Sequence, residues 1–452
     1  MSIPGLGQIP AQPAVSSTRT ITLKPAWEWR FQVATGRSVA VKLVAGTADK
    51  EGVELAPRTA YTLTGTRSSI LTWSGCELEV EGRCDDDSVV QYAHPAANPA
   101  TAHLNLHARL VDMRAAAARL GCEGPRVLVA GPPSAGKTTL ARTLTSYATR
   151  QGHQPVAVNA DPRQGMLSLP GTLSAAVFAT VMDPEAADGW GSTPTSGPSP
   201  VPVKLPLVYY FGRDSAEDDA DLYKELVGRI ASAVSARLSE DASVRSAGVI
   251  VDGMRIGEES KIGLDLIAHV VDELSVNVVV VIGSTSMSAE LTKRFASEKT
   301  SLGEPIQVVA LDRSEGVAER DESFMEHARE QIIKEYFFGG ARRSLSPQIQ
   351  QVDFDSLIIY KAPEDPAYGQ EACLVREEPS SVMQHWTLAV MHASTRDGPE
   401  AVRVASVMGF VYVSDVDEER RKIKVLAPVG GRLGDRPLVW GKWPEPYMNL
   451  LG

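Results

Sequence analysis

One glycine-rich segment combines the residue types and the spacing that hold a nucleotide phosphate. Residues 131–138 read GPPSAGKT and match the pattern G-x-x-x-x-G-K-S/T, between the apolar run RVLVA and a helix-like run. In this pattern glycines let backbone N–H groups point at phosphate oxygens, the lysine reaches the β- and γ-phosphates, and the hydroxyl binds Mg²⁺. The residues expected to contact the nucleotide are Ser134, Ala135, Gly136, Lys137, Thr138 and Thr139, with Thr138 also binding the metal.

Two apolar runs end in an aspartate that could serve the same site. Asp161 ends VAVNAD and Asp252 ends AGVIVD. Asp161 follows the first strand–helix unit, so we expect it beside Lys137, where it could bind Mg²⁺ or act as the catalytic carboxylate of a kinase. For Asp252 two interpretations stay open: a turn or helix-capping aspartate, or a member of the metal shell.

Motifs that are missing narrow the chemistry. No N-K-x-D follows the phosphate loop, which argues against guanine specificity, and no glutamate follows the AGVIVD run, as hydrolysis-driven motors require. Kinase chemistry on a small molecule or a polynucleotide remains.

A charged segment near residue 330 could cover the nucleotide. Phosphoryl transfer needs cations near the moving group, and residues 315–340 offer Arg320 and Arg329 on a predicted lid helix. The alternative is an ordinary amphipathic helix whose inward residues are Phe324, Ile332, Ile333 and Phe337.

These candidate residues lie in a stretch where apolar strands alternate with amphipathic helices. That alternation predicts an α/β fold, a P-loop domain over residues 101–340 with a parallel sheet and a flexible Pro/Ser/Gly-rich insertion at 183–206. The predicted strands are 126–130, 156–160, 247–252, 278–282 and 307–311.

The flanking regions have a different pattern. Residues 1–16 read as a disordered tail, and 17–100 contain short alternating runs typical of a β-sandwich. A helix over 102–121 is predicted to join this sandwich to the P-loop domain. Residues 341–452 are again rich in short alternating runs and predict a small, β-rich C-terminal domain.

Composition excludes several classes of protein. The 452-residue chain carries a net charge of −11, which argues against broad nucleic-acid binding. Its four cysteines lack zinc or disulfide-scaffold spacing, and no apolar run is long enough to span a bilayer. We therefore expect a soluble intracellular protein. Two basic clusters, Arg342–Arg343 and residues 420–424, read either as solvated edges or as weak RNA sites.

Six segments, spread over nearly the full chain, resemble one family in order and spacing. They are EWRFQV (28–33), TWSGCELEV (72–80), GPPSAGKTT (131–139), NADPRQG with SLPGT (159–172), PLVYYFG (206–212) and GVAER…IIKEYFFG (316–339). Together they resemble the Clp-type polynucleotide 5′-hydroxyl kinases and, more narrowly, the fungal subunits of cleavage factor IA in mRNA cleavage and polyadenylation.

The resemblance implies ATP with Mg²⁺ as ligands. Glu28 and Arg67 match the N-terminal residues that help hold the nucleotide in the family. Asp161 matches the catalytic aspartate and Gln164 the glutamine of the same D-x-x-Q-G motif. The resemblance also implies a nuclear location and, as partners, the large scaffold subunit of cleavage factor IA and other 3′-end processing proteins, with RNA contact indirect or weak and no membrane.

This chain departs from the family pattern at residues that, in active members, contact the RNA substrate or the transferred phosphate. Met254 and Arg255 fall where active members carry a base-stacking tryptophan, and Met325 replaces the middle of three lid arginines, while Arg320 and Arg329 match the other two. We therefore expect ATP to be held as a structural ligand without efficient transfer. Two alternatives stay open: an active RNA 5′-hydroxyl kinase using Asp161, Arg320 and Arg329, and a P-loop ATPase switch.

Overall fold

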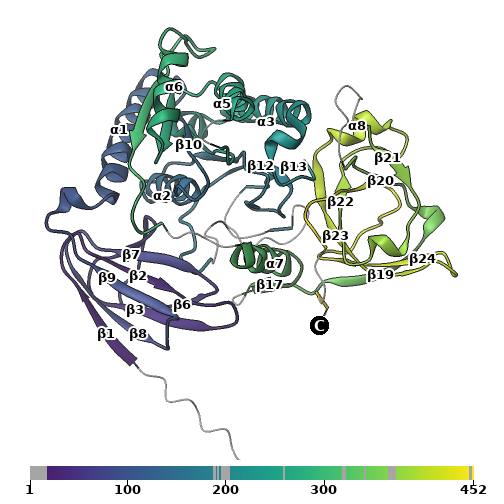
Figure 1. The fold of residues 1–452 in the computed structure, drawn as a ribbon, viewed down its shortest axis with the longest axis horizontal. Helices are drawn as coiled ribbons and strands as arrows, with labels where there is room; N and C mark the ends of the chain where they lie inside the picture. The colour runs from purple at the N-terminus through teal and green to yellow at the C-terminus, as the bar shows by residue number, and fades with distance from the viewer. Residues whose placement is uncertain are drawn as a thin grey trace, which may run out of the picture. The chain divides into compact units, whose positions relative to one another are not determined.

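The computed structural model describes residues 18–186, 190, 193–194, 204–257, 260–317, 322–340, 343–364, 373–446 and 450–451. These residues form two compact units (Figure 1). The first contains the described residues up to Lys50 together with Glu54–Tyr92, and the second contains Glu51–Val53 and the described residues from Ala93 onward.

The first unit is a β-sandwich, as predicted. One sheet has the order β1 (Thr18–Leu23), β8 (Cys76–Glu81), β3 (Ser38–Gly46) and β6 (Ala60–Thr64). The other has the order β5 (Val53–Glu54), β4 (Asp49–Lys50), β7 (Arg67–Leu71), β2 (Glu28–Gln32) and β9 (Asp86–Val90). Alternating side chains point inward, so Trp29, Val41 and Leu78 are fully buried between the sheets.

The second unit is built on a seven-stranded sheet. From edge to edge its strands are β13 (Leu207–Tyr210), β12 (Thr172–Val177), β11 (Val156–Asn159), β14 (Val249–Asp252), β10 (Arg126–Ala130), β15 (Val278–Ile282) and β16 (Gln307–Leu311). The last five pair in parallel, which confirms the predicted fold class. β12 and β13 pair antiparallel at one edge and lie outside the five predicted strands.

Helices cover both faces of this sheet (Figure 1). Residues of α1 (Ala100–Leu120) and α2 (Lys137–Arg150) pack with Val127, Val129 and Val280 in one buried cluster. The other face packs against α3 (Ala220–Glu240), α4 (Ala242–Ala247), α5 (Lys261–Glu273) and α6 (Thr285–Phe295). The strands are therefore buried on both sides, and their carboxyl ends meet along one edge of the sheet.

A second sheet in the same unit contains the C-terminal strands. Its order is β19 (Gln348–Asp353), β24 (Lys422–Ala427), β23 (Val407–Asp417), β22 (Thr387–Met391), β25 (Leu438–Trp440), β20 (Ile359–Lys361) and β21 (Val375–Glu377). Short β17 (Gly339–Gly340) and β18 (Arg343–Ser344) pair with each other in a separate two-stranded sheet, and α8 (Pro399–Arg403) precedes β23. One buried cluster joins this sheet to β13 and to α7 (Glu322–Phe338).

The predicted flexible insertion is only partly described, because 187–189, 191–192 and 195–203 lie outside the described residues. Within it, Trp190 is 4% exposed and packs against Phe178 with ring centroids 5.4 Å apart. The predicted tail at 1–16 also lies outside the described residues. Among the described helices, none combines the length and the apolar character needed to cross a membrane.

Candidate nucleotide-binding site

The loop between β10 and α2 has a backbone that only glycine accommodates at its key positions. Gly131 has φ +151°, and a Cβ there would lie 2.6 Å from the carbonyl oxygen of Ile282. Gly136 has φ +96° and is the N-cap of α2, with no side-chain cap for the helix. The first N–H groups of α2 therefore lack a side-chain acceptor and suit a phosphate.

Lys137 begins α2 and is buried under this loop. Its side chain is 6% exposed, and Nζ donates to the carbonyl oxygens of Gly131 and Pro132 at 3.0 Å each. Burial lowers the pKa of Lys137, while the nearby carboxylates of Asp161 and Asp252 oppose this shift. The ammonium is thus held at the loop and faces two acids, as the sequence predicted for Asp161.

Asp252 ends β14 directly beside the predicted magnesium hydroxyl. The Thr138 hydroxyl donates to its carboxylate, and burial raises the pKa of Asp252 to about 7. Its Oδ1 is buried without a hydrogen-bond partner in the described part of the chain. Asp252 caps no described helix, since α5 begins at Lys261 with Ser260 as its cap. Of the two interpretations left open, this geometry favours the metal shell.

Asp161 emerges from the neighbouring strand, β11. Its backbone N–H donates to Asn159 Oδ1 at 3.1 Å, and its Oδ1 accepts the N–H of Arg163 at 3.0 Å. Asp161 is 3% exposed, and burial raises its pKa against the opposing charges of Lys137 and Arg255. The carboxyl ends of β10, β11 and β14 are adjacent, which is why these groups converge.

These residues fit ATP with Mg²⁺. In the described chain no group of three or more His, Cys, Asp or Glu could hold a metal alone. Mg²⁺ instead uses one or two protein ligands together with phosphate oxygens and water. The Thr138 hydroxyl and the unpaired oxygen of Asp252 provide such a half-site, next to Asp161. Ser134 and Thr139 are exposed on the loop and helix, whereas Ala135 is buried.

The lid residues are placed differently. Arg329 on α7 is 3% exposed, and its Nη2 donates to Glu322 at 3.1 Å and to Glu445 at 2.7 Å. Its guanidinium also lies 4.7 Å from the ring centroid of Trp443. Met325 is partly exposed on the same helix, and Arg320 lies outside the described residues. Arg329 is therefore engaged with the C-terminal segment of the chain.

Inward-facing apolar residues make α7 an amphipathic helix, as the alternative interpretation held. Ile332, Ile333 and Phe337 are buried, together with Tyr336, while Phe324 is partly exposed. Glu322, at the first turn, also accepts from Arg163 at 2.5 Å, so one carboxylate joins α7 to the segment that follows β11.

Glu28 and Arg67 lie in the β-sandwich unit, on the paired strands β2 and β7. Glu28 pairs with Leu71, whereas Arg67 pairs with Gln32, so the two residues are at opposite ends of the strand pair. Four positions separate them, roughly 14 Å along the strands. Glu28 is buried and accepts hydrogen bonds from Arg30 and from Tyr92. The sandwich thus does not bring the two residues together.

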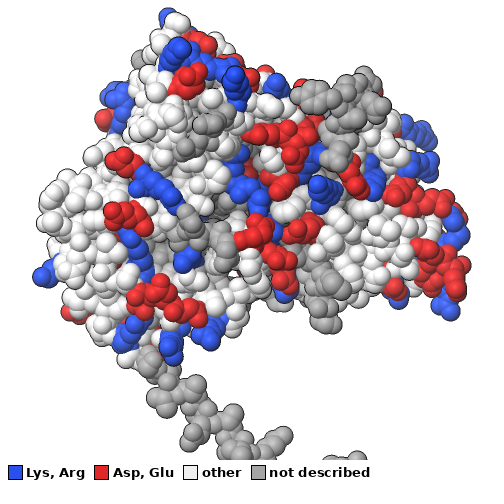
Figure 2. All heavy atoms as spheres, viewed as in Figure 1, with Lys and Arg blue, Asp and Glu red and all other residues white. Residues whose placement is uncertain are grey.

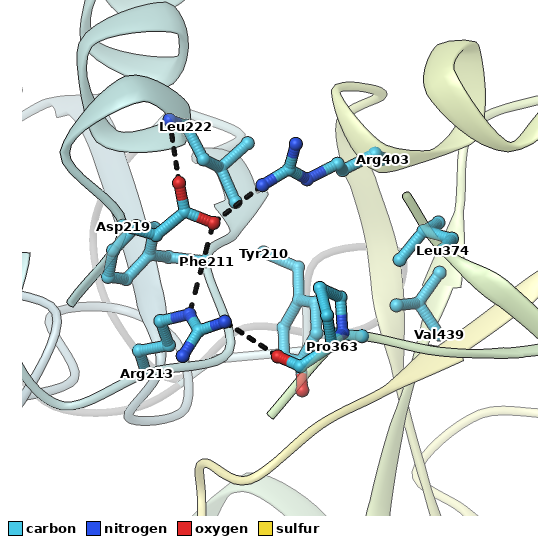
Figure 3. Close-up of a pocket in the computed structure, with 10 residues that line it drawn as sticks. Tyr210, Phe211, Arg213, Asp219, Leu222, Pro363, Leu374, Arg403 and Val439 are labelled. Atoms are coloured by element: carbon cyan, nitrogen blue, oxygen red, sulfur yellow. Dashed lines mark hydrogen bonds and ion pairs between the residues drawn. The ribbon is translucent and has the colours of Figure 1, made fainter. Parts of the chain in front are cut away.

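A cavity elsewhere in the second unit is not a nucleotide site. It measures about 10 Å³, room for about one water molecule. Asp219, 8% exposed, accepts there from Arg403 at 2.5 Å and lies 3.9 Å from Arg213 Nε (Figure 3). The other oxygen of Asp219 accepts from the N–H of Leu222, and Arg213 donates to the carbonyl of Pro363 at 2.6 Å. This cluster ties the P-loop region to the C-terminal sheet.

The basic cluster at 420–424 is paired with acids. Arg420 bonds to Asp417, and Arg421 bonds to Asp355 and Glu378. On the face drawn in Figure 2, described basic and acidic side chains are interspersed. Arg342 of the other cluster lies outside the described residues. The described pairs favour a solvated edge over an RNA track.

Sequence reasoning assigned Arg163 and Arg255 no role in binding the nucleotide. Arg163 bonds to Asp214 at 3.3 Å and to Glu322, and Arg255 lies close enough to Asp161 and Lys137 to change their pKa values. Arg255 follows Asp252 by three residues, so a strict search of strand ends for charged residues would have found it.

Comparisons with known proteins agree over the whole chain. Family models described as "mRNA cleavage and polyadenylation factor CLP1 P-loop", "N-terminal beta-sandwich domain of polyadenylation factor" and "Pre-mRNA cleavage complex II protein Clp1" match residues 131–339, 22–117 and 345–445. The mRNA cleavage and polyadenylation factor CLP1 of Pyricularia oryzae is 54% identical over 100% of both chains, and that of Botryotinia fuckeliana 47%, also over 100% of both.

Two solved structures share the fold. A complex of wild-type Clp1p with Pcf11p has a TM-score of 0.84 and 27% identity, covering 95% of this chain and 98% of its own. A second, on the extended Pcf11p–Clp1p interface and ATP loss in a point mutant, has a TM-score of 0.83 and 27% identity, covering 95% and 99%. Together with the full-length fungal relatives, these likenesses show that this chain belongs to the Clp1 family of mRNA cleavage and polyadenylation factors.

Proposed function

We propose that this chain is a nuclear subunit of the pre-mRNA 3′-end processing machinery that holds Mg-ATP as a structural ligand and connects protein partners. The observation that carries the proposal is the arrangement of phosphate-binding groups at the loop after β10. Lys137 is buried at an uncapped helix start, and an unpaired oxygen of Asp252 stands beside Thr138. A buried polar atom without a partner costs stability, which bound Mg²⁺ would offset.

The residues have separate roles in holding the ligand. The loop N–H groups and Lys137 bind the β- and γ-phosphates, and Thr138 with Asp252 and Asp161 orients Mg²⁺. These residues would hold a bound Mg²⁺, which would supply positive charge to offset that of the phosphates.

The residues of the predicted lid helix, α7, favour binding of ATP without transfer of its terminal phosphate. Arg329 is occupied by Glu322 and Glu445, and Met325 supplies no charge. Removing a positioned arginine costs a factor of about 10³ or more in phosphoryl transfer. The groups that bind the ground-state nucleotide are present, whereas the described lid commits its arginine to carboxylates of the protein itself.

The partner follows from the solved relatives, which are complexes of Clp1p with Pcf11p. We propose that this chain binds the corresponding scaffold subunit of cleavage factor IA, with RNA contact indirect or weak. The paired charges at 417–424 support this, because they leave the described basic cluster neutralised.

A transfer assay separates this function from an RNA 5′-hydroxyl kinase. The purified chain is incubated with γ-labelled ATP, Mg²⁺ and a 5′-hydroxyl RNA, and labelled RNA is measured. We expect no transfer above a protein-free control, and ATP that stays intact on the protein through dialysis. Magnesium-dependent transfer that disappears in Asp161→Ala would establish the kinase instead, and released ADP would establish an ATPase switch.

Stability measurements test the structural role of the ligand. We expect Lys137→Ala with Thr138→Ala to abolish ATP retention and to lower both Tm and binding of the scaffold subunit. The matched control is Thr292→Ala with Lys293→Ala, the same two residue types at exposed positions of α6. Scaffold binding that survives complete loss of ATP would contradict the proposed coupling between nucleotide and partner.

A further inference from the structure

Arg255 lies at the carboxyl end of β14, at the edge of the sheet where the phosphate loop begins. Asp252 pairs with Val129 of β10, and the N–H of Gly253 donates to the Val129 carbonyl at 3.0 Å. A Cβ on Gly253 would lie 2.3 Å from that carbonyl oxygen, so the chain crosses the end of β10 in close contact. This crossing brings the next residues to the rim of the phosphate loop.

The two residues after the crossing have different surroundings. Met254 is 2% exposed and belongs to the core cluster beneath the sheet. Arg255 is only partly buried, and its Nε is shielded from solvent without a hydrogen-bond partner among the described residues. The backbone thus anchors Met254 in the core, whereas Arg255, the next residue, keeps part of its side chain accessible.

Charges around Arg255 belong to the nucleotide site. Burial lowers the pKa of Arg255, and the charges acting on it are those of Asp161, Arg163, Asp214 and Glu322. In turn Arg255 contributes to the pKa shifts of Lys137 and Asp161. Its guanidinium therefore shares one electrostatic environment with the buried phosphate lysine.

The carboxylates near Arg255 already accept hydrogen bonds from other residues. Asp214 and Glu322 both bond to Arg163, Glu322 also bonds to Arg329, and Asp161 accepts the N–H of Arg163. No described carboxylate forms an ion pair with Arg255. A half-buried arginine next to a phosphate cradle, with no protein anion of its own, is suited to an anion supplied by the ligand.

We propose that Arg255 binds the terminal phosphate of the nucleoside triphosphate and makes the site discriminate ATP from ADP. The inference rests on the proposed ATP-binding function and assigns the residue that reads the length of the phosphate chain. Lys137 and the loop N–H groups reach the inner phosphates in both nucleotides, whereas Arg255 gains its contact only with the third phosphate. Arg255 thus acts as a specificity-determining residue for the resident ligand.

Calorimetric titration of ATP and ADP, each with Mg²⁺, into nucleotide-stripped full-length protein tests this. A charge-assisted hydrogen bond corresponds to about a tenfold to a hundredfold change in affinity. We expect Arg255→Gln to weaken ATP binding by this factor and ADP binding by less than about twofold, with Arg255→Lys intermediate. The matched control is Arg229→Gln on α3, an exposed arginine paired with Glu225, which should leave both affinities unchanged.

The outcomes separate the two proposals. If wild-type protein binds ATP and Arg255→Gln keeps the wild-type ratio of ATP to ADP affinity, the assignment of Arg255 is wrong while the ATP-binding function stands. If wild-type protein binds neither nucleotide, the assignment of Arg255 and the proposed ATP-binding function are both wrong. Should Arg255→Gln fail to fold, the Arg255→Lys ratio decides: an unchanged ratio overturns the assignment, and a reduced ratio supports it.

Discussion

Two clusters of buried charge in the second unit differ in how their polar atoms are satisfied. At the junction with the C-terminal sheet, Asp219 accepts bonds through both oxygens, and Arg213 and Arg403 bond to it or to main-chain carbonyls. At the phosphate loop, Asp252 Oδ1 and the Nε atoms of Arg163 and Arg255 are buried without partners in the described chain. The first cluster is complete within the protein, and the second is not.

The difference separates structure from binding. A buried charge that is paired fixes the chain around it, and breaking the pair leaves an uncompensated charge. Unpaired buried polar atoms are costly, so several of them at the end of adjacent strands indicate that a ligand completes the set. The predictions below test this contrast between the junction cluster, Asp219 with Arg213 and Arg403, and the phosphate-loop cluster.

The largest effect is expected at the junction cluster. Asp219→Ala leaves two arginines facing each other and uncaps α3, so we expect the free energy of unfolding to fall by about 3–5 kcal/mol. Urea denaturation with and without Mg-ATP measures it, and the loss should be the same in both conditions. Asp265→Ala is the control, since Asp265 pairs with Arg294 through a side chain that is 65% exposed. If Asp219→Ala lowers the free energy of unfolding no more than Asp265→Ala does, the buried junction cluster stabilises the protein no more than an exposed ion pair.

At the phosphate loop the same kind of change should have the opposite dependence on ligand. Asp252→Asn removes a buried charge without an ion-pair partner, so we expect unliganded stability to stay level or rise. The stabilisation from Mg-ATP, about 2.7 kcal/mol at a ligand concentration of 100 Kd, should be lost. Thermal unfolding over an ATP titration measures both. If Asp252→Asn destabilises the unliganded protein as strongly as Asp219→Ala does, the orphaned oxygen has a structural role.

A third buried group extends the comparison to pH. His107 on α1 is 6% exposed, its Nδ1 has no partner in the described chain, and its ring centroid lies 4.8 Å from that of Tyr147. Burial, followed by the charges of Arg114, His153 and Arg150, lowers its pKa from 6.5 to about 4. Between these values the unfolded chain binds a proton that the folded chain does not, so stability is lost as the pH falls.

For this histidine we expect a loss of about 2 kcal/mol at most between pH 7 and pH 5. Urea denaturation across that range measures it, and His107→Phe should flatten the slope by that amount. His327→Phe, at an exposed position of α7, should leave the slope as in wild type. Identical slopes for wild type and His107→Phe would show that His107 finds a partner or is solvated.

The residues that meet because parallel strands end at the same edge of the sheet could be predicted from the sequence. Because β10 and β11 run parallel on either side of β14, the residues that follow them lie at the same edge of the sheet, and Lys137 and Asp161 interact there. In the sequence, Arg255 marked only the absence of the family's tryptophan. Whether Arg255 is suited to bind an anion depends on which neighbouring carboxylates are already paired, and that requires the structure. The insertion was predicted to be unstructured, yet Trp190 is buried, because one aromatic residue can be anchored by packing that a Pro/Gly-rich composition conceals.

Other features depend on pairing across long stretches of chain. Asp219 and Arg403 are 184 residues apart, and nothing local in either segment indicates the other. In the sandwich, the resemblance matched Glu28 and Arg67 to nucleotide-holding residues of the family, and only the structure shows that the register of β2 and β7 puts them at opposite ends of the strand pair. Residue types were readable from the sequence, whereas register and the partner of each charge required the structure.

The smallest effect is expected at an exposed ion-pair cluster that resembles the junction only in composition. Arg421 bonds to Asp355 at 2.8 Å and to Glu378 at 3.4 Å, but its side chain is 48% exposed and its partners more so. Solvent screens such pairs, so Arg421→Ala should leave the free energy of unfolding close to its wild-type value. Because its charge is already neutralised by acids, RNA affinity in a gel-shift assay should also stay at the wild-type value. A large loss of RNA binding would show that 420–424 is an RNA site. It would also show that a basic residue at this surface can bind RNA even though it is paired with acids.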